Sequence, residues 1–130
     1  MEILPIIIEK SQGRLWGRVD YQNNSFTDIA TTAEGLEKKL RAQLRKYFHL
    51  DPAKIVFQRK YDLTALFIHF SFLKINAIAN LCDIEPLVLR QYAAGIHFPS
   101  EEEVQKMEHL LRSIGQELLR AQIVIHKENK

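Results

Sequence analysis

Four side chains between residues 85 and 91 carry groups that suit contact with the base edges of DNA. Arg90 can pair with guanine, Gln91 can pair with adenine, and Leu87 can touch a thymine methyl group. Glu85 begins the same segment and is a further candidate for a base or groove contact. Three flanking residues are candidates for phosphate contacts: Lys74, His97 and Ser100.

Such contacts require a helix with one free side. The stretch NAIANLCDIEPLVLRQYAAG (residues 76–95) predicts two short helices joined by a tight turn. Asn76 is the expected N-cap of the first helix. The second helix is expected over residues 85–93, with Pro86 in the first turn, where a missing N–H costs nothing. Gly95 is expected to end it, because glycine readily takes the left-handed conformation that follows a helix.

Small and apolar residues fall where two such helices must cross. Ala79 permits a close approach, and four residues later Asp83 stands in the turn, where aspartate tolerates a left-handed backbone. Ile84, Leu89 and Tyr92 are the apolar positions expected to seat the second helix. The first helix has a short apolar side: Ile78, Ala79 and Leu81. This spacing is typical of a DNA-binding helix-turn-helix.

The run RQYAAGIHFPSEEEVQKMEHLL (residues 90–111) resembles the Xre/Cro/lambda-repressor type of helix-turn-helix. That family often has an aromatic residue, a glycine and a Pro-Ser pair at these offsets, followed by a helix. The resemblance implies an all-α DNA-binding domain over residues 62–125, with helix 85–93 in the major groove of double-stranded operator DNA. It also implies a homodimer, since operators are commonly two-fold symmetric. The plainer interpretation is an ordinary helical bundle with the same spacing.

A long helix is expected after residue 100. Ser100 and Glu103 form the pattern of a capping box. The helix that follows has a narrow apolar seam, which predicts packing on the helical core or a share in a dimer interface: Val104, Met107, Leu111, Ile114 and Leu118. Residues 121–125 can continue this helix or form a strand, and residues 126–130 read as a frayed polar tail.

The first 61 residues predict a small α+β domain. Residues 3–9 are an isoleucine-rich run that reads as a buried strand, and residues 14–21 alternate as a half-buried strand does. Thr31 and Glu34 suggest a capping box at the start of a helix. The expected order is strand, strand, strand, helix, strand: residues 3–9, 14–21, 25–30, 31–49 and 55–61.

The layout of EKSQGRLWGRVDYQNNSFTDIATTAEGLEKKLRAQL (residues 9–44), followed by a helix-turn-helix, resembles the HicB family of antitoxins. In that family a partial ribonuclease-H-like domain precedes a DNA-binding domain. The resemblance implies an antitoxin-like regulator whose N-terminal domain (residues 1–61) binds a toxin protein or a second copy. The family's usual Pro-Gly-Cys turn between the second and third strands is absent.

Composition narrows the class of protein. The chain has 130 residues, 46% hydrophobic and 26% charged, which suits a folded core. It has no apolar run long enough for a membrane helix, and its N-terminus lacks the features of a signal peptide, so a cytoplasmic protein is expected.

Residues 1–60 hold 11 Lys and Arg against 7 Asp and Glu, a net +4, and residues 61–130 hold 7 against 9, a net −2. A domain that neutralises phosphates is usually basic. This division of charge therefore favours residues 1–60 as the part that would bind a polyanion.

The division of charge, together with a row of polar and aromatic side chains on the second strand, is also compatible with a second class of function. Arg14, Trp16 and Arg18 alternate along the second strand and could stack on a base or anchor a protein. The chain would then be a protein- or RNA-binding adaptor, with a structural helix-turn-helix. Alternatively, Trp16 simply covers the edge of the sheet or packs under the helix.

An enzyme is not expected. The five histidines and Cys82 lack metal-ligand spacing, and the sequence has no phosphate loop or nucleophile motif, so no metal or cofactor is expected. Glu9 and Asp28 could belong to a metal-dependent nuclease centre, although surface charge explains them better. The single cysteine excludes an internal disulfide, and Cys82 is expected to be buried.

Overall fold

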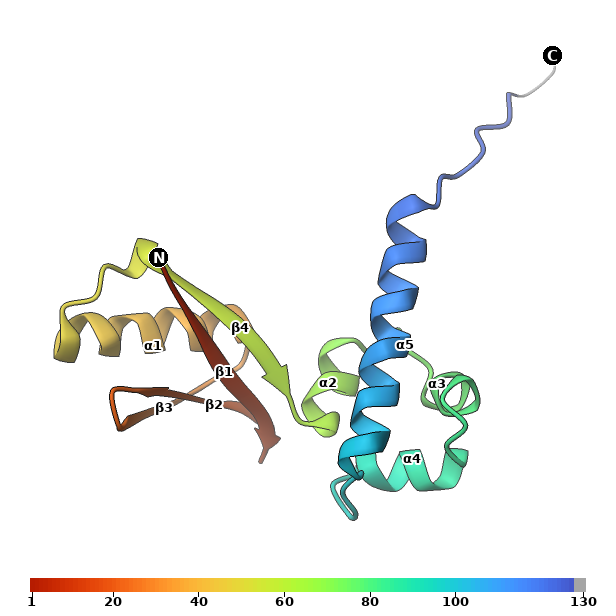
Figure 1. Ribbon diagram of the computed structural model, residues 1–130, viewed down its shortest axis with the longest axis horizontal. Coiled ribbons are helices and arrows are strands. Elements are labelled where there is room, and N and C mark those ends of the chain that lie inside the picture. The colour runs from red at the N-terminus through yellow and green to blue at the C-terminus, as the bar shows by residue number, and fades with distance from the viewer. Residues whose placement is uncertain (128–130) are drawn as a thin grey trace.

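The computed structural model describes residues 1–127 and has a mixed α+β architecture. In this part of the chain, a four-stranded sheet and one of the five α-helices come first, and the other four α-helices follow (Figure 1). None of these helices combines the length and the apolar character needed to cross a membrane.

The sheet has the order β3-β2-β1-β4. Its strands are β1 (Glu2–Ser11), β2 (Arg14–Tyr21), β3 (Asn24–Ala30) and β4 (Ile55–Tyr61). The first three form an antiparallel meander, and β4 pairs parallel to β1. Both hairpin turns use left-handed backbone, at Gln12 and Gly13 and at Gln22 and Asn23.

Helix α1 (Ala33–Phe48) covers one face of this sheet and closes the first core. Leu36, Leu40 and Leu44, which recur at helical spacing, are fully buried against the inward side chains of the strands. Gly17 leaves room for them, because a Cβ there would lie 3.2 Å from methyl carbons of Leu36 and Leu40. A bidentate ion pair ties the helix to β4, with Arg59 Nε 2.8 Å and Nη2 3.2 Å from the two carboxylate oxygens of Glu37.

The second half holds α2 (Leu63–His69), α3 (Ile75–Leu81), α4 (Pro86–Ala93) and α5 (Glu101–Arg120). Their buried side chains form a second core: Ile78, Ala79, Cys82, Ile84, Leu89 and Met107. The sequence pattern did not predict α2, which begins at Asp62, where the side chain accepts a hydrogen bond from Ala65 N. The burial of Cys82 is as expected, and it raises the pKa of that thiol.

Helix α2 takes part in both cores. Ala65 is buried in the first core, whereas Leu63 and Phe67 pack against the second. The backbone N–H of Asp62 donates to Ile8 O at the end of β1, and His69 stacks on Tyr61 of β4. The link between the sheet and the helices is therefore a packed contact.

Several local expectations were wrong. Lys74, without a side-chain hydrogen bond, takes the N-cap position of α3, and Asn76 lies inside the helix. Thr32 caps α1 by accepting from Gly35 N, because the helix starts one residue later than the Thr31–Glu34 box requires. Leu81 is exposed. Strand β1 alternates in burial, because only one face of the sheet is covered.

Helix α5 begins as predicted, with a complete capping box between Ser100 and Glu103. It ends at Arg120, and residues 121–127 continue as irregular chain that projects away from the helices (Figure 1). These residues therefore neither extend the helix nor join the sheet. The last part of the predicted frayed tail, residues 128–130, lies outside the described residues.

Candidate nucleic-acid interface

Helix α4 is seated as the spacing of its apolar residues predicted. Leu89 and Ala79 are fully buried at the contact between α4 and α3, and Ile84 is buried just before α4 begins. Asp83 has φ of 56°, the left-handed conformation expected of the turn. Because these apolar side chains all point to the core, the opposite side of α4 is left free.

The free side of α4 carries most of the predicted base-contact residues. Glu85 is its N-cap and is exposed, Leu87 is 52% exposed, and Arg90 is exposed. Gln91 is half-buried. Leu87 lies about one turn before Arg90 and Gln91, so an approaching ligand would meet an apolar side chain beside a guanidinium and an amide, with the Glu85 carboxylate at the start of the helix.

Arg90 has a partner that the sequence did not reveal. Its Nη1 donates a 2.6 Å hydrogen bond to Oδ1 of Asn76 on α3. Both side chains are exposed, so the bond directs the guanidinium without burying it. The residue expected to cap α3 thus orients the most specific candidate for base recognition on α4.

The three candidates for phosphate contacts differ in whether their side chains already have hydrogen-bond partners. Lys74 at the start of α3 and His97 after α4 are exposed, and their side chains make no hydrogen bond or ion pair within residues 1–127. The Ser100 hydroxyl already accepts from Glu103 N and donates to Glu103 Oε1, each at 3.2 Å. Its role in capping α5 therefore competes with the predicted phosphate contact.

Two hydrogen bonds fix α4 against its neighbours. Tyr92 OH donates to Glu103 Oε1 at 2.9 Å, and Thr64 Oγ1 donates to Ala93 O at 2.6 Å. The N–H of Ser100 and, to a smaller degree, the Tyr92 hydroxyl hold the pKa of the Glu103 carboxyl below its ordinary value. The same bond raises the pKa of Tyr92. Sequence reasoning missed both bonds because each joins residues on different helices.

The sheet face opposite α1 holds the second group of candidates. Arg14, Trp16 and Arg18 all point to this uncovered face, and Trp16 is 42% exposed. A shallow hollow beside Trp16 is lined by Ile7, Glu9, Arg18 and Thr27, among others. Exposed Ile3 and Val56 extend the apolar surface across β1 and β4. Trp16 therefore neither packs under α1 nor completes the core.

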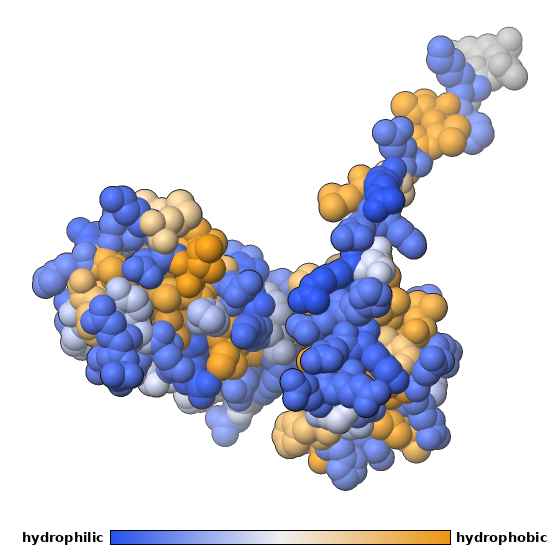
Figure 2. Space-filling model, viewed as in Figure 1, coloured by the Kyte–Doolittle hydropathy of each residue, from blue (hydrophilic) through white to orange (hydrophobic). Residues whose placement is uncertain are grey.

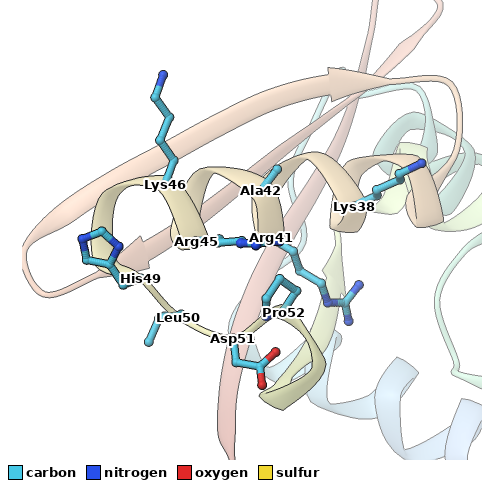
Figure 3. A pocket seen from close by; sticks show the side chains of 9 residues that line it. All are labelled: Lys38, Arg41, Ala42, Arg45, Lys46, His49, Leu50, Asp51 and Pro52. Carbon is cyan, nitrogen blue, oxygen red and sulfur yellow. The ribbon is translucent and has the colours of Figure 1, made fainter.

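The basic side chains of α1 lie on the other side of the sheet. A hollow at the C-terminal end of α1 is lined by Lys38, Arg41, Arg45, Lys46 and His49, together with residues 50–52 (Figure 3). Figure 3 shows that Lys38 and Lys46 point away from one another. Arg41 donates to Ile55 O and lies over the Phe57 ring. The cations do not converge on one point, and they share no face with Trp16.

The carboxylates of the sheet do not meet. Asp28 lies on the α1 side, where it accepts a hydrogen bond from Gln43, whereas Glu9 is on the open face beside Trp16. Residues 1–127 contain no group of three His, Cys, Asp or Glu side chains placed to hold a metal ion. The pair suggested for a nuclease centre is thus split between two faces.

Comparison of the chain with protein-family models, with curated proteins and with solved structures found no match.

Proposed function

We propose that this chain is a sequence-specific DNA-binding regulator of the HicB-like antitoxin type, in which residues 62–125 form a separate helix-turn-helix domain. Helix α4 would enter the major groove of operator DNA, with Glu85, Leu87, Arg90 and Gln91 toward the bases. The chain would act as a homodimer, because two recognition helices about 34 Å apart match two successive major grooves.

The observation that carries this proposal is the division of α4 into a buried and a free side. Leu89 is fully buried, whereas Leu87 and Arg90, two positions before it and one after it, are exposed. An exposed leucine beside an oriented guanidinium offers an apolar contact for a thymine methyl group and a donor pair for guanine on one side of the helix. Lys74 and His97 lie at the two ends of the same unit and suit phosphates.

The test is fluorescence anisotropy with duplex DNA from upstream of the gene, set against a scrambled duplex of equal length. We expect the upstream duplex to bind more tightly, and we expect this preference to persist as salt rises. Equal binding of both duplexes, with only a salt-dependent electrostatic component, would reject sequence-specific recognition.

We further propose that the open sheet face around Trp16 binds a protein partner, a toxin by the HicB resemblance. The exposed indole lies between two arginines and lines a hollow together with Ile7, and aromatic side chains and arginines are enriched at protein interfaces. The alternative adaptor that binds RNA needs Trp16 and the basic helix α1 on one face, and they lie on opposite faces of the sheet.

Co-expression with the product of the neighbouring gene tests this second surface. Trp16→Ala should abolish co-purification, and Lys38→Ala on α1 is the matched control that should retain it. Loss of the complex in the Lys38→Ala variant alone would assign the partner to α1 instead.

A further inference from the structure

The C-terminal part of α5 extends beyond the core that its first part helps to form. Met107 is buried, and Leu111 and Ile114 pack partly against the helical core. One turn later Leu118 is 66% exposed and Leu119 is 87% exposed. The apolar seam of this helix therefore continues past the surface that it covers.

The chain after α5 has the same character. Residues 121–127 are irregular, and Ile123, Val124 and Ile125 are 94%, 71% and 88% exposed. Among the described residues no hydrogen bond involves the backbone of residues 122–127. Figure 2 shows apolar side chains gathered along this projecting end. We call residues 112–127 the C-terminal arm.

An arm of this composition is unfavourable in water when it is alone. Five large apolar side chains within residues 118–125 are exposed together, and such contiguous patches mark interaction sites. Free backbone N–H and C=O groups in an apolar segment favour the addition of another strand. The arm therefore needs a partner that covers side chains and completes hydrogen bonds.

We propose that the partner is the arm of a second copy, paired antiparallel with the first. Two identical strands in antiparallel pairing satisfy a two-fold axis, so one segment supplies both sides of the contact. Ala121, Ile123 and Ile125 alternate with Gln122 and Val124. A register in which Ile123 faces its own copy places Ala121 opposite Ile125 and keeps this apolar face continuous.

The ends of the two α5 helices would complete the contact. A shallow hollow beside the arm is lined by Arg112, Gly115, Gln116, Leu118 and Leu119. In the paired arrangement this hollow receives the isoleucines of the other copy. Stable interfaces bury about 800 Å² per partner with at least about 20 residues a side. Residues 112–127 are 16 residues, fewer than this size class has on each side, so a weak dimer that forms only at micromolar concentration is expected.

Within one copy the arm has no strand to pair with, because it projects away from the sheet and its free strand edges (Figure 1). The pairing of two arms rests on the homodimer of the proposed function and assigns it a surface, but it can be tested without DNA or a toxin. It identifies a specific surface for self-association and leaves the free side of α4 and the Trp16 face open.

Sedimentation equilibrium at micromolar concentration tests the proposal. The unchanged chain should sediment as a dimer and Ile123→Asp as a monomer, with no loss of helix content, because Ile123 touches nothing within one copy. Ile96→Asp is the matched control, since Ile96 is also exposed but lies after α4. It should remain a dimer. A monomeric unchanged chain, or a dimer that survives Ile123→Asp, would overturn the proposal.

Cysteine cross-linking tests the register. Cys82 is the one cysteine of the chain and is buried, so Cys82→Ala gives a background without thiols. In that background Ile123→Cys should form a covalent dimer on mild oxidation, because each thiol faces its own copy across the axis. Ile96→Cys should not. Equal yields from both variants would reject the antiparallel pairing of the arms.

Discussion

The guanidinium of Arg90 is held by Asn76 Oδ1 at 2.6 Å, across the junction of α3 and α4. Both residues are exposed, and both lie next to the free side of α4. An oriented guanidinium loses less side-chain freedom when it binds a ligand than a freely rotating one. In the proposed function, the contact would prepare Arg90 for recognition of a planar acceptor pair such as the edge of guanine.

The first prediction concerns Arg90 itself. Arg90→Ala should weaken binding of the upstream duplex by about 1–3 kcal/mol, because one base contact is removed. Anisotropy titrations at fixed salt measure the change. Arg45→Ala, which removes an exposed arginine of α1, is the control and should leave DNA affinity unchanged. An Arg90→Ala variant that binds as well as the unchanged chain would remove Arg90 from the interface.

Asn76→Ala extends this prediction. If Asn76 acts by orienting Arg90, its removal should matter only while Arg90 is present. A double-mutant cycle should then give a coupling energy of about 0.5–1.5 kcal/mol in DNA binding. Additive effects of the two substitutions would show that Asn76 contributes independently of Arg90.

Hydrophobic periodicity was sufficient to predict most helices and strands. The alternation of residues 14–21 and the leucine spacing of α1 each follow from one covered face, which a sequence displays directly. Strand β1 was harder, because the isoleucine-rich run of residues 3–8 predicts burial on both sides, whereas Ile3 and Ile7 lie on the open face. The number of covered faces depends on the rest of the fold.

The candidate site shows the same limit. The turn at Asp83 and the burial of Leu89 were predicted, because each depends on local spacing. The partnership of Asn76 with Arg90 was not, because it joins residues on two helices whose angle is set by packing. Asn76 also satisfies the usual pattern of an N-cap, and that local preference concealed its actual contact.

The second prediction concerns the attachment of α4 to α2. Thr64→Val removes the hydroxyl that donates to Ala93 O at 2.6 Å and leaves a partly buried carbonyl without its partner. The free energy of unfolding should fall by about 1–2 kcal/mol. Urea titration monitored by circular dichroism measures it. Thr27→Val, an exposed position on β3, is the control and should change stability by only a few tenths of a kcal/mol.

The third prediction concerns pH. The N–H of Ser100 and the Tyr92 hydroxyl hold the pKa of Glu103 below its ordinary value of 4.5. A carboxyl whose pKa is lowered by folding stabilises the folded state above its unfolded pKa, and this stabilisation is lost as pH falls through the folded value. The unchanged chain should therefore exceed Glu103→Gln in stability at neutral pH, and the difference should shrink below pH 4.5.

Urea titrations of both proteins across this range measure that difference. Glu102→Gln is the control, because Glu102 makes only an exposed ion pair with Lys106 at 4.0 Å. Its effect on stability should be small at every pH. A Glu103→Gln difference that stays constant into acid would show that the hydrogen bonds do not depend on the charge of Glu103.

The last prediction concerns the contact of β2 with α1. Gly17→Ala would place a Cβ 3.2 Å from methyl carbons of Leu36 and Leu40, both fully buried. These leucines are enclosed by other core side chains and cannot move aside freely, so the free energy of unfolding should fall by about 1–3 kcal/mol. Thermal and urea unfolding measure the loss. Made in a Leu36→Ala background, Gly17→Ala should cost less than it does in the unchanged chain, since the smaller side chain makes room for the new methyl group. If Gly17→Ala instead raises stability, the sheet and α1 pack less closely than this distance indicates.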